Sequence, residues 1–222
     1  GVDVIGEVPV ARWGADDVPE LEEPVASRVR HGGFVRGAEL MDNMLFGVSA
    51  AETAAMDPQQ RLLLEYGYVA LHDARLGREA LEGSSTGVYV GIADSGFVKV
   101  LGKTGRFTGV YSATGSSLSV SCGRLSYLLG MQGPAVTYET ACSATLVACH
   151  GGVRGLQLGE CTHSAVEGVM LILSSDGTIS IAIAAMTSSR GRSHTFDERA
   201  DGYARAEGCG TLTLRGASPS EA

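Results

Sequence analysis

The stretch Pro134–Gly159, PAVTYETACSATLVACHGGVRGLQLG, constrains the fold more than any other part of the chain. It opens with an apolar, β-branched run that is typical of a buried strand. A sharp turn is predicted at Ala141-Cys142-Ser143, followed by a helix. Helical spacing places five small residues along one side of this helix: Ala144, Ala148, Gly151, Gly152 and Gly155. Because glycine destabilises a helix interior, a side with such small residues is expected only where another backbone packs closely against it.

Cys142 lies where the predicted strand passes into the predicted helix. The free N–H groups and the positive dipole end of a helix N-terminus favour a thiolate. A thiolate is a good nucleophile toward acyl groups. A small buried cysteine used for packing explains the same position equally well, since free cysteine is among the most buried residue types. The local pattern leaves both interpretations open.

Four segments in collinear order carry a family resemblance. They are Met56–Glu65 (MDPQQRLLLE), Gly87–Gly91 (GVYVG), Thr140–Ala148 (TACSATLVA) and Thr195–Gly208 (TFDERADGYARAEG). In this order they resemble the motifs of β-ketoacyl synthases, the condensing enzymes of polyketide and fatty-acid synthesis. The MDPQQR segment is most similar to the ketosynthase domains of modular polyketide synthases. Four matches spread along most of the chain are far more specific than one cysteine motif.

Strands that alternate with helices predict an α/β layered fold. The resemblance implies the thiolase-like αβαβα fold with a mostly parallel mixed sheet, of which residues 1–222 would form the N-terminal half without its first strand. Ser49 and Glu52 have the spacing of a capping box. Residues 1–37, 94–115 and 174–197 are expected to be mainly irregular. The other predicted elements are helices over Pro58–Ala74 and Ser116–Gly130 and strands over Thr86–Ala93, Ala165–Leu173 and Gly210–Leu214.

The resemblance also implies a chemistry. Cys142 would be the nucleophile, and its backbone N–H would contribute to the oxyanion hole. The reaction would be a decarboxylative Claisen condensation between an acyl group on Cys142 and a malonyl unit. Both substrates would travel on the phosphopantetheine of an acyl carrier protein, with no cofactor or metal bound to the domain. The parent domain would be a homodimer joined through the Pro134–Thr140 strand.

Some expected residues are missing. The family's two histidines lie in its second half, in H-G-T-G-T and G-H motifs that do not occur here. The chain alone is therefore expected to be catalytically incomplete. A non-catalytic half-ketosynthase used for interaction or dimerisation is the alternative, and a thiolase is a weaker one that the DPQQR segment disfavours. Glu167 and Met170 replace the usual Gly and Asn of a buried strand, where a carboxylate is costly unless paired or protonated.

Charge and composition exclude several other classes. A net charge of −8 gives no electrostatic support for binding nucleic acid or an anionic membrane. The five cysteines form no C-x-x-C pair, and the histidines complete no metal-binding spacing. Reduced thiols suggest a reducing compartment, either cytoplasm or organelle stroma. The chain has no apolar run of about 18 residues. No leader is visible, although the sequence opens without a methionine.

Overall fold

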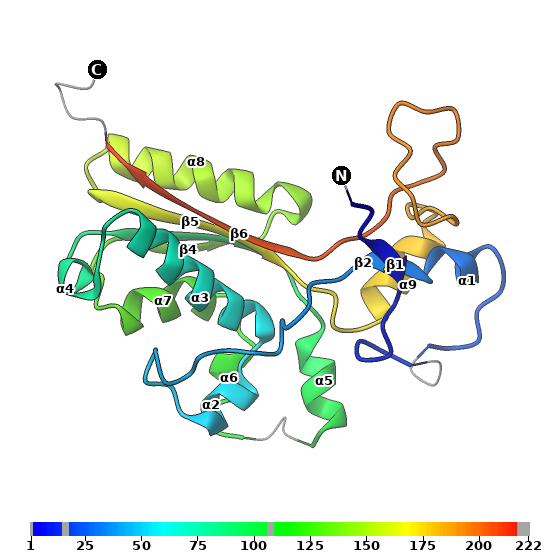
Figure 1. Ribbon diagram of the computed structural model, residues 1–222, viewed down its shortest axis with the longest axis horizontal. Helices are drawn as coiled ribbons and strands as arrows, with labels where there is room; N and C mark the ends of the chain where they lie inside the picture. The colour runs from blue at the N-terminus through cyan, green and yellow to red at the C-terminus, as the bar shows by residue number, and fades with distance from the viewer. Residues whose placement is uncertain (1, 15–17, 106–108, 217–222) are drawn as a thin grey trace. The chain divides into compact units, whose positions relative to one another are not determined.

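The computed structural model describes residues 2–14, 18–105 and 109–216 (Figure 1). These residues form two compact units. The first unit comprises Gly1–Arg36, Ser95–Gly105 and Met170–Gly208. The second comprises Gly37–Asp94, Arg106–Val169 and Cys209–Ala222, and we call it the sheet unit because it contains most of a four-stranded sheet. The nucleophile candidate Cys142 belongs to the sheet unit.

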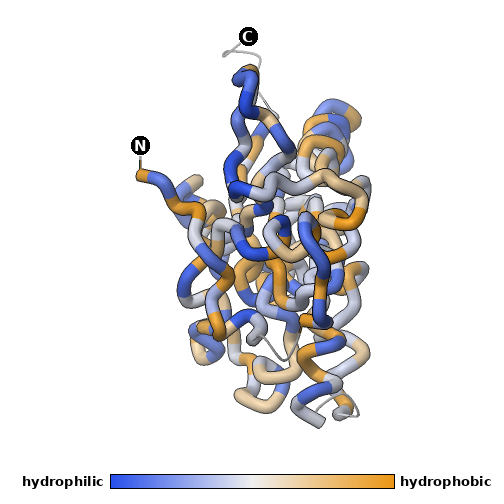
Figure 2. Tube along the Cα trace, turned by 90° about the vertical axis from the view of Figure 1, so that its right-hand side faces the viewer, coloured by the Kyte–Doolittle hydropathy of each residue, from blue (hydrophilic) through white to orange (hydrophobic). Residues whose placement is uncertain are grey.

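The four strands are ordered β4-β3-β5-β6. The central strand β3 pairs in parallel with β4 on one side and β5 on the other. All six residues of β3 are buried, as expected for a strand covered on both faces. The observed bounds confirm the predicted strands to within a few residues: β3 Gly87–Ile92, β4 Ala135–Tyr138, β5 His163–Met170 and β6 Gly208–Arg215. Figure 2 shows the hydropathy of the chain along the same path.

Helices cover both faces of this sheet (Figure 1). Helix α8, Ala144–Gln157, lies on one face, and its predicted smooth side is the side that is buried. Helices α3 (Pro58–Asp73) and α7 (Val120–Leu128) lie on the other face. A methyl group at Gly152 of α8 would lie 2.8 Å from Val166 of the sheet. The absence of a side chain there is what lets the helix approach the strands so closely.

Strand β4 differs from its prediction. The sequence pattern indicated a buried strand over Pro134–Thr140, whereas β4 is an edge strand with Ala135 exposed and its other residues half-buried. Within the described part of the chain, β4 pairs only with β3. Its apolar residues cover Tyr89 and Ala148 on one side. Position in a sheet is a tertiary property that β-branched composition does not encode.

The DPQQR segment begins α3, and its polar side chains are buried. Asp57 is the N-cap and accepts a hydrogen bond from the Gln59 amide at 2.8 Å. Polar residues at a helix start usually serve as caps or face solvent, whereas the side chains here are buried. Arg61, for example, donates from Nε and Nη2 to the Met56 carbonyl and from Nη1 to that of Glu39.

The two glutamines fasten distant loops. Gln59 donates to the Ala93 carbonyl at 2.9 Å, just after β3. Gln60 donates to the carbonyls of Thr114 and Ser117 at 3.2 and 3.0 Å. Each bond joins a buried side-chain amide of α3 to a backbone carbonyl far along the chain. The motif is therefore a set of internal anchors that order the segments around α3.

Arg124 of α7 belongs to the same polar cluster. Its Nε donates to Gln60 Oε1 at 2.8 Å, and its Nη1 lies 2.5 Å from Glu52 Oε1. Arg124 is therefore a buried arginine whose charge is paired with a carboxylate. Glu52 completes half of the predicted capping box, because its amide N–H donates to Ser49 Oγ at 3.1 Å. Its side chain pairs with Arg124 instead of returning to the cap.

Several segments that we expected to be irregular contain short helices or strands. The glycine-rich composition around them hid the helical pattern, and residues 106–108 lie outside the described part. The predicted Ser116–Gly130 helix is shorter, beginning at Val120. In α3, Val69 is half-exposed and does not supply the predicted apolar contact. Helix α2, Ala50–Ala55, begins at the predicted Ser49 cap. The additional elements are β1 Ile5–Glu7, α1 Val25–Arg28, β2 His31–Gly33, α4 Arg78–Leu81, α5 Phe97–Lys103, α6 Ser112–Gly115 and α9 Asp176–Ile183.

Glu207 organises the first unit. Its side chain is 0% exposed, and its carboxylate accepts hydrogen bonds from Arg12 Nε and Nη2 at 3.1 and 2.8 Å. The same carboxylate accepts from the backbone amides of Val35 and Ile172 at 2.8 and 2.9 Å. Four segments that are far apart in sequence therefore meet at one buried anion. Strands β1 and β2 form an antiparallel pair in the same unit.

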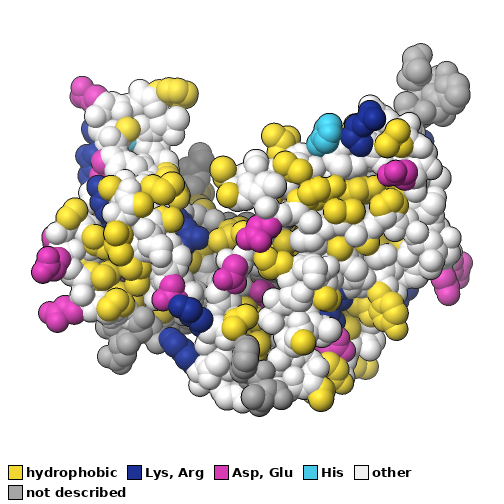
Figure 3. Space-filling model, turned by 180° about the vertical axis from the view of Figure 1, so that it is seen from behind, with side chains coloured by type: hydrophobic (Ala, Val, Ile, Leu, Met, Phe, Trp, Pro, Cys, Tyr) yellow, Lys and Arg dark blue, Asp and Glu magenta, His cyan; other side chains and the backbone are white. Residues whose placement is uncertain are grey.

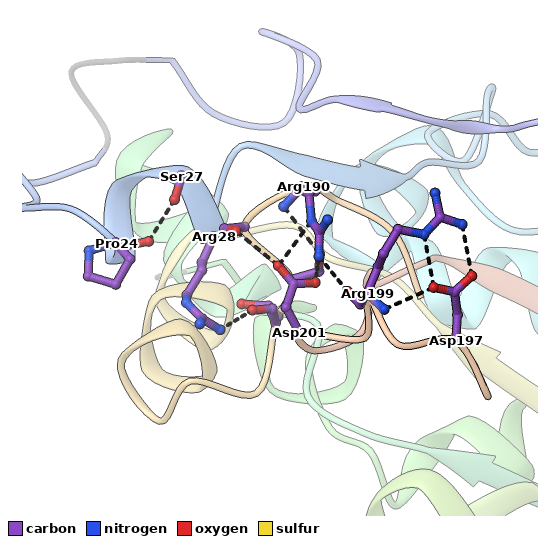
Figure 4. Close-up of polar contacts among 10 residues, drawn as sticks. Pro24, Ser27, Arg28, Arg190, Asp197, Arg199 and Asp201 are labelled. Atoms are coloured by element: carbon purple, nitrogen blue, oxygen red, sulfur yellow. Dashed lines mark hydrogen bonds and ion pairs between the residues drawn. The ribbon is translucent and has the colours of Figure 1, made fainter. Parts of the chain in front are cut away.

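The arginines of residues 188–201 are paired with acids (Figure 4). Arg190 lies 3.5 Å from Asp201, and Arg199 makes a bidentate pair with Asp197. The hydroxyl of Ser188 donates to Asp201 at 2.6 Å, and this bond is the main reason that the pKa of Asp201 falls to about 2. The charges of these arginines are therefore largely neutralised by neighbouring carboxylates.

Candidate functional site

The turn between β4 and α8 carries Cys142. The residue before it, Ala141, has a φ of +53°, in the left-handed region that non-glycine residues rarely adopt. A 3₁₀ turn, η2 (Ala141–Ser143), then leads directly into α8. The predicted sharp turn is confirmed. This conformation costs a non-glycine residue about 1 kcal/mol or more.

Ser143 closes the turn. Its hydroxyl donates to the Thr140 carbonyl at 2.8 Å and to Thr140 Oγ1 at 2.9 Å, and its amide donates to the same carbonyl at 3.3 Å. These three bonds span Ala141 and Cys142. The backbone on both sides of the thiol is therefore fixed by one residue pair. Thr and Ser flanking a turn are the sequence signal for such a closure, which was not among the predicted features.

Among the five cysteines, all of which the structure describes, Cys142 alone is exposed. Cys122 and Cys161 are buried, and Cys149 and Cys209 are half-buried. Burial raises the pKa of Cys209 to about 12, so this thiol stays protonated and unreactive at neutral pH. A buried packing role does not fit the exposure of Cys142. The position suits a thiol that must meet a substrate.

Glu167 occupies the opposite face of the sheet from that turn. Its side chain is fully buried, and neither carboxylate oxygen has a hydrogen-bond partner among the described residues. It fills the space left by Gly67 of α3, next to Leu125 of α7. Burial raises its pKa to about 8, so the carboxyl is protonated at neutral pH. Gly168, the next residue, faces α8 instead.

The five histidines do not assemble with Cys142 into a catalytic group. His72 and His150 are exposed, and the other three are partly exposed. No cluster of three His, Cys, Asp or Glu side chains that could hold a metal ion occurs in residues 2–14, 18–105 and 109–216. Within the same residues, no helix is both long enough and apolar enough to cross a membrane.

The family model for the β-ketoacyl synthase N-terminal domain matches residues 1–219. The chain belongs to the β-ketoacyl synthase family. A mycocerosic acid synthase-like polyketide synthase from Mycolicibacterium smegmatis is 38% identical over 217 residues, which is 97% of this chain. A phenolphthiocerol/phthiocerol polyketide synthase subunit from Mycobacterium tuberculosis is equally similar. The ketosynthase resemblance is therefore confirmed.

Solved ketosynthases share the fold of this β-ketoacyl synthase. An oxazolomycin ketosynthase domain from Streptomyces albus matches 99% of the chain with a TM-score of 0.85 and 30% identity. The ketosynthase from module 6 of the Bacillus subtilis bacillaene synthase matches 96% with a TM-score of 0.81 and 30% identity. These neighbours confirm the thiolase-like α/β fold. The chain spans 10% and 12% of the two curated relatives and 39% and 34% of the two solved chains.

Proposed function

We propose that this chain is the N-terminal part of a ketosynthase domain that condenses a Cys142-bound acyl group with a malonyl unit on an acyl carrier protein. The exposed thiol of Cys142 in the closed turn before α8 carries the proposal. Phosphopantetheine of the carrier would present both substrates as thioesters. The class of enzyme is an acyltransferase, and the domain itself would bind no cofactor.

The proposed chemistry has two steps. In the first, the Cys142 thiolate attacks the thioester carbonyl of the carrier and a new C–S bond forms. The C–S bond to the carrier breaks, and the carrier sulfur leaves as a thiolate that takes a proton from solvent. The backbone N–H of Cys142 would be one donor to the oxyanion. In the second, the malonyl unit loses CO₂, its α-carbon attacks the acyl-Cys142 carbonyl, and the thiolate is released. The family's histidine motifs for this second step are not among these 222 residues.

Cys142 is expected to react first among the five thiols. Limiting iodoacetamide, followed by peptide mass spectrometry, should label Cys142 at least tenfold faster than Cys149 or Cys209, because those two are half-buried. Cys122 and Cys161, both buried, are internal controls. Treatment with an acyl thioester should block labelling at Cys142 alone. Preferential labelling of another cysteine would contradict the assignment of the nucleophile.

The 222-residue chain alone is expected to form no β-ketoacyl product from acyl- and malonyl-carrier substrates. The reason is that the enolate would lack the histidine donors that stabilise it, a contribution of several kcal/mol. Radiolabelled malonyl-carrier protein and product chromatography measure this. Self-acylation of Cys142 in the same samples is the positive control. Product at the rate of a complete ketosynthase would reject the expected incompleteness.

We also propose that the parent domain is a homodimer through the Pro134–Thr140 segment, because β4 presents an unpaired edge within the described residues. Ala135→Asp is expected to shift the full-length protein toward monomer, since a charge near a two-fold axis meets its own image. Ala113→Asp, an equally exposed site on α6, is the matched control. Light scattering at micromolar concentration decides it. A monomeric wild type, or equal dimerisation of both variants, would reject this interface.

A non-catalytic interaction module remains the second candidate. Three apolar side chains on or next to α8 favour it, because Leu146, Val153 and Leu158 are 74%, 37% and 61% exposed. Figure 3 shows hydrophobic side chains gathered on the molecular surface. Such a surface suits a protein partner. Carrier-dependent acylation of Cys142 distinguishes the two functions, since an interaction module has no need of it.

A further inference from the structure

The first turn of α8 rests on two glycines of the sheet. Gly91 of β3 and Gly168 of β5 are directly opposite one another in the parallel register. Both lie beneath Thr145, three residues after Cys142. Because neither glycine has a side chain, the two adjacent strands leave one continuous gap under the start of the helix. Thr145 lies over both glycines, and its other side is exposed to solvent.

The two glycines contact different parts of Thr145. A methyl group at Gly91 would lie 2.5 Å from the Ala144 carbonyl carbon and 2.6 Å from Thr145 Cα, both backbone atoms. A methyl group at Gly168 would lie 2.6 Å from Thr145 Cγ2 and would also overlap Thr145 Oγ1. Interiors packed to crystal-like density cannot absorb such overlaps without a shift. At Gly91 the helix backbone itself must move, whereas at Gly168 the side chain obstructs.

We infer that Gly91 and Gly168 are positioning residues for Cys142, an inference that rests on the proposed acyl transfer. They set the height of the first turn of α8 above the sheet. On the other side of the thiol, Ser143 ties the backbone to Thr140. Cys142 is thus held between a fixed turn and a seated helix. A displacement of about 1 Å at a reacting group lowers a rate up to a hundredfold.

Gly152 provides a matched control on the same helix. A methyl group there would lie 2.8 Å from Val166 Cγ2 and 2.9 Å from Ser164 Oγ, so this substitution also overlaps side chains of the sheet, although less closely. Gly152 is ten residues after Cys142, roughly 15 Å along an α-helix. A substitution at Gly152 loosens the packing of α8 without touching its first turn. The Gly152 variant therefore separates the effect of lower protein stability from the effect of a displaced Cys142.

The test compares two reactions of the same thiol in the full-length protein. Acyl transfer from an acyl-N-acetylcysteamine thioester needs an aligned oxyanion donor, whereas alkylation by iodoacetamide needs only an accessible thiolate. The ratio of the two rate constants at Cys142 therefore reports position. Gly91→Ala and Gly168→Ala are each expected to lower this ratio at least tenfold. Gly152→Ala should leave it within twofold of the wild type, even where the melting temperature falls equally.

Removal of the obstructing side chain supplies the decisive comparison. Thr145→Ala should raise the ratio in Gly168→Ala back toward the wild-type value, because it removes Oγ1 and Cγ2 and leaves only the Cβ contact at 3.0 Å. Thr145→Ala should not restore the ratio in Gly91→Ala, because the overlap at Gly91 is with backbone atoms. A folded Gly91→Ala or Gly168→Ala protein with the wild-type ratio would overturn the inference, as would an equal fall in Gly152→Ala.

Folding and function are kept distinguishable. If Gly91→Ala does not fold, the Gly168→Ala and Gly168→Ala/Thr145→Ala pair still decides, since its obstruction is removable. A wild type whose Cys142 is alkylated but never acylated would overturn the proposed function, and this inference with it. A wild type that is acylated, with glycine variants that keep its ratio, would overturn the positioning role alone.

Discussion

Replacing Glu167 by glutamine is expected to remove a steep pH dependence from the stability of the fold. The pKa of Glu167 rises from 4.5 to about 8 on folding because the carboxyl is buried without a partner. Between these values the folded state keeps a proton that the unfolded state releases. Raising the pH therefore favours unfolding by about 1.4 kcal/mol per pH unit. Below pH 4.5 both states are protonated, and above pH 8 both are ionised, so the slope is confined to that window.

Urea unfolding of wild type and Glu167→Gln at pH 5, 6, 7 and 8 measures this. The difference in unfolding free energy should grow by about 4 kcal/mol across the range in favour of the variant. Glu160→Gln, an exposed site after α8, should run parallel to the wild type. Cys209 faces Glu167 but has a pKa of about 12, so it does not titrate in this window. Parallel curves for Glu167→Gln and wild type would show that the carboxyl is ionised in the fold.

The second large effect is expected from Glu207→Ala. The substitution leaves the guanidinium of Arg12 and the amides of Val35 and Ile172 without their buried acceptor. Loss of one partner of a buried ion pair typically destabilises a protein by about 3–5 kcal/mol. The midpoint of urea unfolding should fall accordingly. Glu207→Gln should lose less, since it keeps one oxygen acceptor and the volume of the side chain.

Arg30→Ala is the control for a pair that is already solvated. Arg30 and Glu23 lie 3.6 Å apart, and both side chains are 61% exposed. Exposed pairs contribute at most about 1 kcal/mol. Their removal should therefore leave the unfolding midpoint almost unchanged. An equal loss in Arg30→Ala and Glu207→Ala would contradict the central place of the buried carboxylate.

Much of the layered fold was predictable because its signals are local. The small residues at helical spacing in α8 identified the buried side of that helix, and the apolar runs identified β3, β5 and β6. The edge position of β4 was not predictable, since it depends on which strands are neighbours. The Glu167 side chain occupies the space that Gly67, a hundred residues earlier, leaves open. No local sequence pattern predicts that contact.

The candidate site shows the same division. The sequence placed Cys142 at a turn before a helix, and the family resemblance singled out its sulfur. Neither indicated that Ala141 adopts a left-handed conformation or that Ser143 bonds back to Thr140. Gly91 and Gly168, the glycines under Thr145, are present in the sequence, but their position beneath the helix depends on the register between β3 and β5. Geometry of this kind arises only when distant strands meet.

The anchors made by Gln60 also bear on the order in which the chain acquires structure during synthesis. Its amide group meets the carbonyls of Thr114 and Ser117, which are translated 54 and 57 residues later. Until both residues have left the ribosome, burial of that amide would leave its N–H donors without these acceptors. A buried unsatisfied donor costs about 1–3 kcal/mol of stability. Helix α3 can form early, yet the buried contacts of Gln60 can form only when synthesis has nearly reached α7. The signature that marks the family therefore also delays the closure of its own core.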